Sequence, residues 1–134
     1  MKLKDIPAAY RVAIKGLVHD EAGRLLFVRE RGDAWDLPGG GLEHGEDALE
    51  ALKREFLEEL KVTIEIQRQD PLIVPTWNAK FDDPVLIIAY YVRLLSTPQA
   101  TKDVRELRYL SEQEADALPL DSTLAMIVSQ FYRA

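Results

Sequence analysis

The chain has 134 residues, a net charge of −6 and no cysteine. Its length predicts one domain over residues 1–134, large enough to bury a core of its own. The lack of cysteine excludes a disulfide framework, a zinc–thiolate site and a cysteine nucleophile. The acidic balance disfavours broad electrostatic binding to nucleic acid, and no apolar run in the sequence is long enough to span a membrane. We therefore expect a cytoplasmic protein without a membrane partner.

The first half of the chain predicts two strands, a glycine-rich loop and a helix. Alternating apolar residues at 10–18 and β-formers at 24–29 indicate the strands, joined by a hairpin turn at Asp20–Gly23. The glycines and the proline between residues 30 and 46 indicate a structured loop.

A capping box marks the start of the helix. Asp47 suits the N-cap, and Glu50 suits the N3 position, from which its side chain can reach back to the cap. An apolar stripe at helical spacing then predicts the face that packs on the core. The residues of this stripe are Leu49, Leu52, Phe56 and Leu60.

The second half of the chain predicts further strands and two helices. Residues rich in β-formers indicate strands at 62–66, 72–74, 85–95 and 104–110. A loop is predicted at 75–84, and a second capping box at Ser111–Glu114 starts a short helix. Apolar residues between 120 and 131 indicate an amphipathic C-terminal helix. This order predicts an α/β (α+β) domain in which helices flank a mixed β-sheet.

Three carboxylates share one side of the first helix. Glu55, Glu58 and Glu59 stand at i, i+3 and i+4, which gathers them on one face. Like charges so arranged repel one another, so either water screens them or cations hold them together. Ala48 and Ala51 lie on the same face in the preceding turns. Small side chains there let the glycine loop fold close over the helix, which favours a cation site over a solvated acidic face.

Oxygen ligands of this kind suit Mg²⁺, which commonly bridges to the phosphate oxygens of a substrate. The glycine loop can add a backbone carbonyl, because glycine permits close approach of the main chain. Arg54 stands four residues from both Glu50 and Glu58, so it can hold one carboxylate by a bidentate pair. Glu46 can in turn hold Arg54 from the loop.

These residues resemble the signature of the Nudix hydrolase family. The family's box is G-x5-E-x7-R-E-U-x-E-E-x-G-U, where U is a bulky apolar residue. The positions that match it are Gly40, Glu46, Arg54, Glu55, Phe56, Glu58, Glu59 and Val62. The preceding segment Trp35–Gly39 is similar to the family's lead-in, and the order of elements is similar to a Nudix fold over nearly the whole chain.

The resemblance implies an α/β/α sandwich and a hydrolase that cleaves a pyrophosphate bond in a nucleoside diphosphate linked to another group. It also implies Mg²⁺, with Mn²⁺ as an alternative. The implied metal ligands are the carbonyl of Gly39 and the carboxylates of Glu55, Glu58 and Glu59.

Further catalytic roles follow from the same resemblance. Glu46 and Arg54 are the implied orienting pair. The general base is either a box glutamate or a glutamate on a later loop, for which Glu106 is the candidate. Bound cations in such a site neutralise diphosphate charge, polarise phosphorus and lower the pKa of an attacking water.

One position departs from the box, because Lys61 stands where the family has glycine. A glycine after a helix usually forms a left-handed C-cap, and a lysine there costs about 1 kcal/mol. We therefore expect either reduced stability or a different turn at the end of the helix. The metal ligands upstream are expected to remain functional.

Four side chains outside the box are candidates for binding the substrate. Arg29 and Arg31 leave the second strand near the glycine loop and can grip a phosphate, and ordinary surface charge explains them equally well. Trp77 and Phe81 lie in the 75–84 segment, where exposed rings can stack on a base or simply pack. For Trp35, packing in the core is the favoured interpretation.

Several functions remain open at this point. The resemblance favours a small MutT-like enzyme acting on a nucleoside triphosphate, while nucleotide sugars, dinucleoside polyphosphates and RNA 5′ ends are alternatives. Two other classes are a non-catalytic Nudix module that binds a nucleotide and an acidic scaffold for protein partners. All the box glutamates are present, which favours an enzyme. We expect a monomer or a homodimer.

Overall fold

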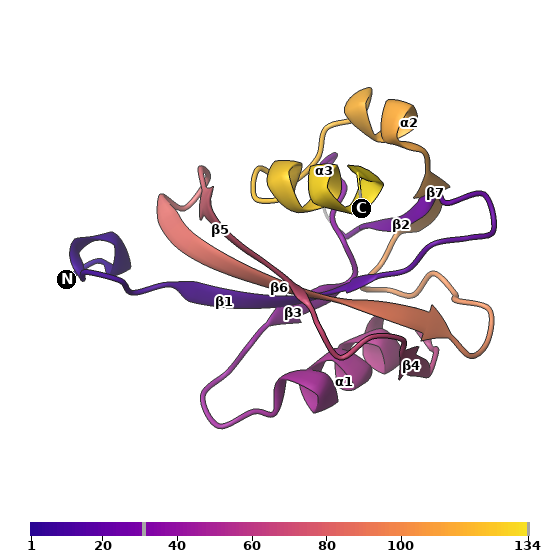
Figure 1. The fold of residues 1–134 in the computed structure, drawn as a ribbon, viewed down its shortest axis with the longest axis horizontal. Coiled ribbons are helices and arrows are strands. Elements are labelled where there is room, and N and C mark those ends of the chain that lie inside the picture. The colour runs from indigo at the N-terminus through magenta and orange to yellow at the C-terminus, as the bar shows by residue number, and fades with distance from the viewer. Residues whose placement is uncertain (31, 134) are drawn as a thin grey trace.

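The structure is a computed structural model that describes residues 1–30 and 32–133. Its main element is a curled, mixed sheet of five strands (Figure 1). The strands of this main sheet are β1 (Arg11–Leu17), β3 (Gly39–Gly41), β4 (Ile64–Ile66), β5 (Leu72–Asn78) and β6 (Asp83–Leu94). β1 pairs with β6 in parallel, whereas β3, β4 and β5 pair antiparallel with their neighbours.

A second, two-stranded sheet pairs β2 (Leu25–Arg29) with β7 (Glu106–Leu110). The helical elements are the 3₁₀ turn η1 (Leu3–Asp5), α1 (Ala48–Leu60), α2 (Glu112–Asp116) and α3 (Ala125–Arg133). α1 packs on one face of the main sheet, and α3 packs on the other beside the small sheet (Figure 1). This arrangement confirms the predicted α+β fold with a mixed sheet between helices. Within residues 1–30 and 32–133, no helix has the length and apolar character needed to cross a membrane.

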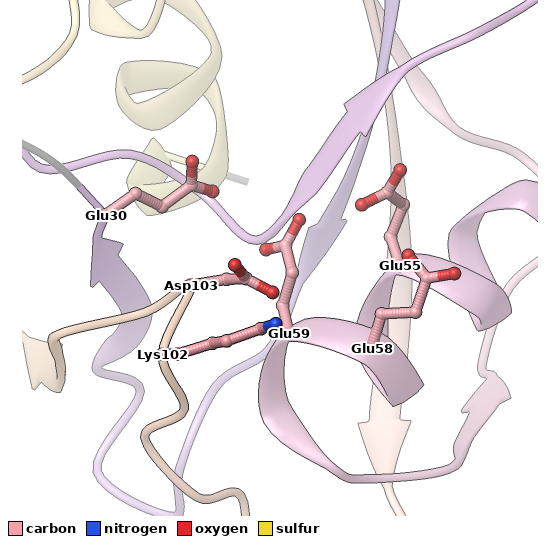
Figure 2. Close-up of a pocket in the computed structure, with 6 residues that line it drawn as sticks. All are labelled: Glu30, Glu55, Glu58, Glu59, Lys102 and Asp103. Atoms are coloured by element: carbon pink, nitrogen blue, oxygen red, sulfur yellow. The ribbon is translucent and has the colours of Figure 1, made fainter.

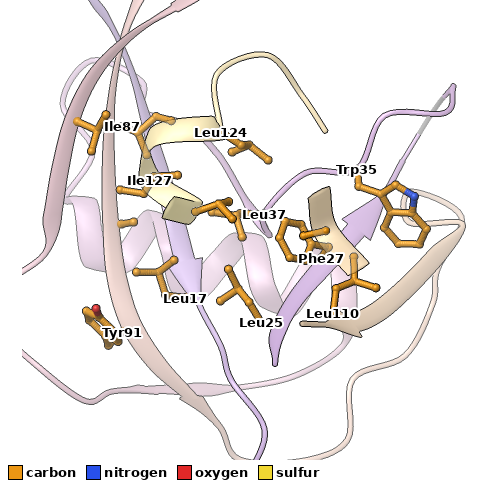
Figure 3. Packing of buried hydrophobic residues seen from close by; sticks show 14 of the residues in the cluster. Leu17, Leu25, Phe27, Trp35, Leu37, Ile87, Tyr91, Leu110, Leu124 and Ile127 are labelled. Carbon is orange, nitrogen blue, oxygen red and sulfur yellow. The ribbon is translucent and has the colours of Figure 1, made fainter. Parts of the chain in front are cut away.

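Two apolar cores hold the layers together, and β2 contributes to both of them. Leu25 and Phe27 pack in the core beneath α3. Figure 3 shows part of this core. Leu26 and Val28 pack in the core beneath α1. A strand buried on both faces is typically a continuous apolar run rather than an alternating one, which explains the sequence of this strand.

The predicted hairpin at Asp20–Gly23 is partly right. The turn forms, because the Asp20 carboxylate accepts hydrogen bonds from the backbone N–H groups of Ala22 at 3.0 Å and Arg24 at 2.9 Å. Beyond one isolated bridge, however, the strands on either side join different sheets. β1 stays in the main sheet, and β2 pairs with β7.

Two segments that the sequence predicts as loops form strands. Gly39–Gly41 make up β3, which pairs with β1 from Ala13 to Lys15. β5 continues through Pro75 to Asn78, whereas the sequence predicts that it ends at Val74. Among the described strands β5 pairs only with β6, and an edge strand tolerates proline.

Helix α1 begins and packs as its sequence predicts. The Asp47 carboxylate accepts a hydrogen bond from the N–H of Glu50 at 3.0 Å, which confirms the N-cap. The Glu50 carboxylate lies 3.6 Å from Lys53 Nζ instead of closing the capping box. The residues of the predicted stripe that are fully buried are Leu52, Phe56 and Leu60.

Helix α1 ends at Leu60, and its C-cap residue Lys61 adopts the left-handed conformation with φ 55° and ψ 37°. Its N–H donates to the carbonyl groups of Leu57 and Phe56. The chain therefore keeps the turn that a glycine would make, and the alternative of a different turn is wrong. The expected strain at this position remains, because a side chain in this conformation crowds the following backbone.

Lys61→Gly is expected to raise the free energy of unfolding by about 1 kcal/mol, since glycine reaches this conformation without a Cβ clash. Urea denaturation of the two proteins measures the difference. Lys53→Gly, in the exposed interior of the same helix, is the matched control and should lower stability by about 1 kcal/mol. If Lys61→Gly is no more stable than the parent, position 61 is not strained.

Candidate functional site

The three glutamates on one face of α1 meet other charged side chains in an open pocket of about 440 Å³ (Figure 2). Helix α1 supplies three of the lining residues from its last two turns. The segment after β2 supplies one more, and the segment before β7 supplies the other two. The six lining residues are Glu30, Glu55, Glu58, Glu59, Lys102 and Asp103. We call this cavity the acidic pocket.

The glycine strand β3 lies directly over the glutamate face of α1. A Cβ atom on Gly40 would lie 2.7 Å from Oε1 of Glu55, so this carboxylate occupies space that any side chain at position 40 would fill. Gly39 is constrained differently, because its φ is 140° and a Cβ there would lie 2.1 Å from the carbonyl oxygen of Ile14. The close approach of loop and helix, which the small residues of the helix predict, is confirmed.

Arg54 links the loop to the helix as the sequence predicts. Its Nη2 donates to Glu46 at 3.0 Å, and its Nη1 donates to Glu58 at 3.2 Å. The same Nη1 lies 3.4 Å from Glu55 Oε1. The backbone N–H of Glu43 and the Arg54 guanidinium both donate to Glu46 and hold the pKa of that carboxyl below its usual range. One guanidinium therefore holds two of the three helix glutamates, Glu55 and Glu58, relative to the loop.

Glu59 is the most strongly perturbed group in the acidic pocket. Burial, a hydrogen bond with the Glu55 carboxyl group and the charge of Glu30 raise the pKa of Glu59 to about 9, although the Lys15 ammonium opposes this rise. Its Oε2 atom is buried and has no hydrogen-bond partner among the described residues. At neutral pH the metal-free pocket therefore retains a proton that a cation would replace.

This donor set fits a divalent cation that prefers oxygen ligands. The carboxylates crowd together, and one buried oxygen is unpaired. A hard cation such as Mg²⁺ would neutralise the repulsion between the carboxylates and would bind the unpaired oxygen. As the side chains stand, no three acidic or imidazole groups of the described residues converge on one point. Glu58 has a side chain that is 57% exposed, so it can turn toward a cation by giving up its hydrogen bond with Arg54. Cation binding therefore requires side-chain rotation, while the helix backbone already places the carboxylates on one face.

The structure adds Glu30 and Asp103 to the acidic pocket, and sequence spacing missed both. Glu30 follows β2, and Asp103 stands shortly before β7. Because β2 and β7 pair antiparallel, with Arg29 opposite Glu106, these strand ends come together. The sequence shows that each carboxylate lies beside an apolar strand. It does not show that the two strands pair, which is what brings the carboxylates close together.

Glu106 and Arg29 are bound to each other, and neither lines the acidic pocket. Arg29 Nη2 donates to Glu106 Oε1 at 2.7 Å. The Arg29 guanidinium also lies 5.3 Å from the ring centroid of Trp35, and the Arg108 guanidinium lies 5.8 Å from the same centroid. Trp35 is 3% exposed, which confirms that it packs in the core (Figure 3).

The aromatic candidates for substrate binding lie near the turn that joins β5 to β6. Trp77 is 45% exposed and Phe81 is 66% exposed, and neither lines the acidic pocket. Trp77 Nε1 donates to Asp82 Oδ1 at 3.1 Å. A role for these rings in binding a substrate stays a prediction. Arg31, the remaining candidate, lies outside the described residues.

Comparison with known proteins identifies the family. The sequence model of the NUDIX domain matches residues 9–131. This chain belongs to the NUDIX family. An RNA pyrophosphohydrolase from Dinoroseobacter shibae is 39% identical over 84 residues, which cover 59% of this chain and 50% of that protein. The match thus spans half the length of this relative.

Solved structures share the fold of this Nudix chain. The solution structure of the E. coli ORF135 protein has a TM-score of 0.78 at 19% identity, covering 99% of this chain and 94% of that chain. The MutT protein from Methanosarcina mazei Go1 has a TM-score of 0.74 at 21% identity, covering 96% of each chain. At these identities the likeness establishes the fold alone.

Gly40→Ala is expected to weaken Mn²⁺ binding about 10-fold, because the new methyl group would displace the Glu55 carboxylate. The stability cost should stay below about 1 kcal/mol, since the displaced group is the end of a flexible side chain. Electron paramagnetic resonance of free Mn²⁺ measures the affinity. Gly41→Ala is the matched control, because a Cβ on Gly41 would meet no atom within 4 Å. Equal Mn²⁺ affinity in the two variants would contradict this role of Gly40.

The free energy of unfolding of the metal-free protein is expected to fall as the pH rises from about 5 to about 9. The folded-state pKa of Glu59, about 9, lies above its ordinary value of 4.5, so the folded state binds more protons than the unfolded state between these values. Urea denaturation in the presence of a chelator, repeated across this pH range, measures the slope. Glu59→Gln should flatten it, and an unchanged slope in that variant would exclude Glu59 as its source.

Proposed function

We propose that this Nudix protein is a hydrolase that cleaves a pyrophosphate bond in a nucleotide-type substrate, with Mg²⁺ as the cofactor and Mn²⁺ as a substitute. The observation that carries the proposal is the unbalanced negative charge of the acidic pocket. Glu59 lies there with a buried, unpaired oxygen and a raised pKa, hydrogen-bonded to Glu55. Such crowding is unfavourable unless cations neutralise it, and a diphosphate, which is also anionic, needs the same cations to bind.

The residues of α1 and β3 would hold the cation. Bound there, it would neutralise diphosphate charge, polarise phosphorus and lower the pKa of an attacking water. Arg54 and Glu46 keep two of the carboxylates in register with the glycine strand. The proposed ligands are the carbonyl of Gly39 and the carboxylates of Glu55, Glu58 and Glu59.

Asp103 is a better placed general base than Glu106. It lines the acidic pocket and is exposed, so it can accept a proton from water that enters the pocket. Glu106 is instead paired with Arg29, and its proposed role is to orient the Arg29 guanidinium. Arg29 and Lys102, the latter lining the pocket, are the proposed contacts to phosphate oxygens.

A nucleoside triphosphate and a 5′-triphosphorylated RNA end are the two substrates to test first. Both present the same polyphosphate group to the acidic pocket. The second is favoured by the relative named as an RNA pyrophosphohydrolase. The net charge of −6 disfavours an extended RNA interface, so recognition would be limited to the RNA end.

A non-catalytic nucleotide-binding module is the alternative function. Such a module would not need the complete set of carboxylates or a proton acceptor beside them. This chain keeps all the box glutamates and places Asp103 in the same pocket. The arrangement therefore favours catalysis by a single domain over binding alone.

Glu58→Gln and Glu59→Gln should each lower Mg²⁺-dependent hydrolysis about 100-fold or more, because each removes a charged cation ligand. The measurement is phosphate or pyrophosphate release from nucleoside triphosphates, dinucleoside polyphosphates, nucleotide sugars and 5′-triphosphorylated RNA. Product analysis then shows which phosphorus is attacked.

Glu50→Gln is the matched control on the same helix. Its carboxylate pairs with Lys53 outside the acidic pocket, so this variant should keep the parent activity. Undiminished hydrolysis in both Glu58→Gln and Glu59→Gln would refute the metal assignment. No hydrolysis of any substrate by the parent, despite tight Mg²⁺ binding, would favour the non-catalytic module.

A further inference from the structure

Strand β1 carries a buried lysine that the proposed chemistry does not use. Lys15 is 8% exposed, and its ammonium donates to Asp36 Oδ2 at 3.2 Å and to the carbonyl of Leu37 at 3.3 Å. Burial opposes its charge, but the carboxylates of Asp36, Glu59 and Glu30 together outweigh this effect and raise the pKa of Lys15. A buried ion pair is no more stabilising than well-packed apolar side chains would be, so stability alone does not explain it.

Lys15 acts from the face of the main sheet opposite α1. Its neighbours Ile14 and Gly16 pack toward α1, and alternate residues of a strand point to opposite faces. The Lys15 side chain therefore reaches the lead-in segment Asp36–Leu37 behind the glycine strand. The backbone of Lys15 also pairs with Gly39 in β3.

The Asp36–Leu37 segment is also held in place by hydrogen bonds that do not involve Lys15. The Asp36 carboxylate accepts a hydrogen bond from the N–H of Leu37 at 2.7 Å. The Asp36 backbone exchanges two hydrogen bonds of 2.8 Å with Val28 of β2. Lys15 thus adds a side-chain link between the two sheets, because it lies in the main sheet and binds a residue fastened to the small one. It acts beside the backbone hydrogen bonds from Leu26 to Val18 and from Gly16 to Pro38.

We propose that Lys15 is a positioning residue for the cation site. By tying β1 to the Asp36–Leu37 peptide, it fixes β3 against α1, so that Gly40 meets the Glu55 carboxylate at the required separation. The inference rests on the proposed function only in assuming that the acidic pocket binds a divalent cation. It does not depend on any particular substrate.

Charge and position predict opposite effects on cation binding. The Lys15 ammonium lowers the pKa of both Glu59 and Glu30, so its charge is felt in the acidic pocket. A neighbouring positive charge repels a cation, and its removal alone would tighten binding. Loss of a positioning contact would weaken binding instead. The sign of the change in affinity therefore separates the two roles.

The test compares Lys15→Met and the double variant Lys15→Met/Asp36→Leu with the parent. The double variant buries no unpaired charge, so it should fold even where the single variant does not. In both variants the Mn²⁺ dissociation constant, measured by electron paramagnetic resonance, should rise about 10-fold or more. In the metal-free proteins, amide hydrogen exchange should accelerate in β3 relative to β6.

Leu124→Ala is the control for a general loss of stability. Leu124 is fully buried in the core beneath α3, so this variant should be destabilised but should keep the parent Mn²⁺ affinity. Unchanged or tighter Mn²⁺ binding in the folded Lys15 variants would overturn the proposal. A parent protein that binds Mn²⁺ and hydrolyses no substrate would defeat the proposed function and leave the role of Lys15 standing.

Discussion

The close approach of two neighbouring glycine-bearing strands to helix α1 is the constraint on which the site depends. A Cβ atom on Gly16 of β1 would lie 2.5 Å from the ring of Phe56, and one on Gly40 of β3 would lie 2.7 Å from the Glu55 carboxylate. At both contacts the main chain meets a helix side chain with nothing between them. Larger residues would force the helix away from the sheet, which would separate its carboxylates from the backbone of β3.

This approach brings carboxylates close together so that they repel one another, and three positively charged side chains offset this repulsion only in part. Arg54 holds the glutamates from the loop side, Lys15 acts from behind the sheet, and Lys102 lies at the pocket itself. The pKa of Glu59 nevertheless stays raised, so these cations do not neutralise the pocket. Arg54 and Lys15 also hold parts of the backbone through hydrogen bonds. They therefore set the shape of the site while leaving its charge for a bound cation to balance.

The local features of the site could be predicted from sequence, because they follow from the helical period. The shared face of Glu55, Glu58 and Glu59 and the Asp47 N-cap both depend on residues within a few positions of one another. Their geometry is set by short-range backbone hydrogen bonds. For this reason the shared face and the N-cap matched their predictions, whereas the sequence left the turn at Lys61 open.

The remainder of the site could not be predicted, because it depends on pairing between distant strands. Arg29 and Glu106 are 77 residues apart in the chain and 2.7 Å apart in space. The pairing of β2 with β7 brings Glu30 and Asp103 to the same pocket, and the spacing of residues along the chain does not predict this pairing. The turn at Asp20–Gly23 shows the same limit, since its local chemistry predicts a reversal but not which sheet the second strand joins.

Strand β2 couples the stability of the fold to the geometry of the site. Its side chains pack alternately in both cores, so the strand cannot shift without disturbing the two layers together. Glu30 follows this strand directly, and Asp36 is bonded to Val28 within it. The position of Glu30 in the acidic pocket and the position of Asp36 before the glycine strand therefore both depend on β2. A site that must hold like charges close together thus depends in part on a strand that packing on both faces keeps in place.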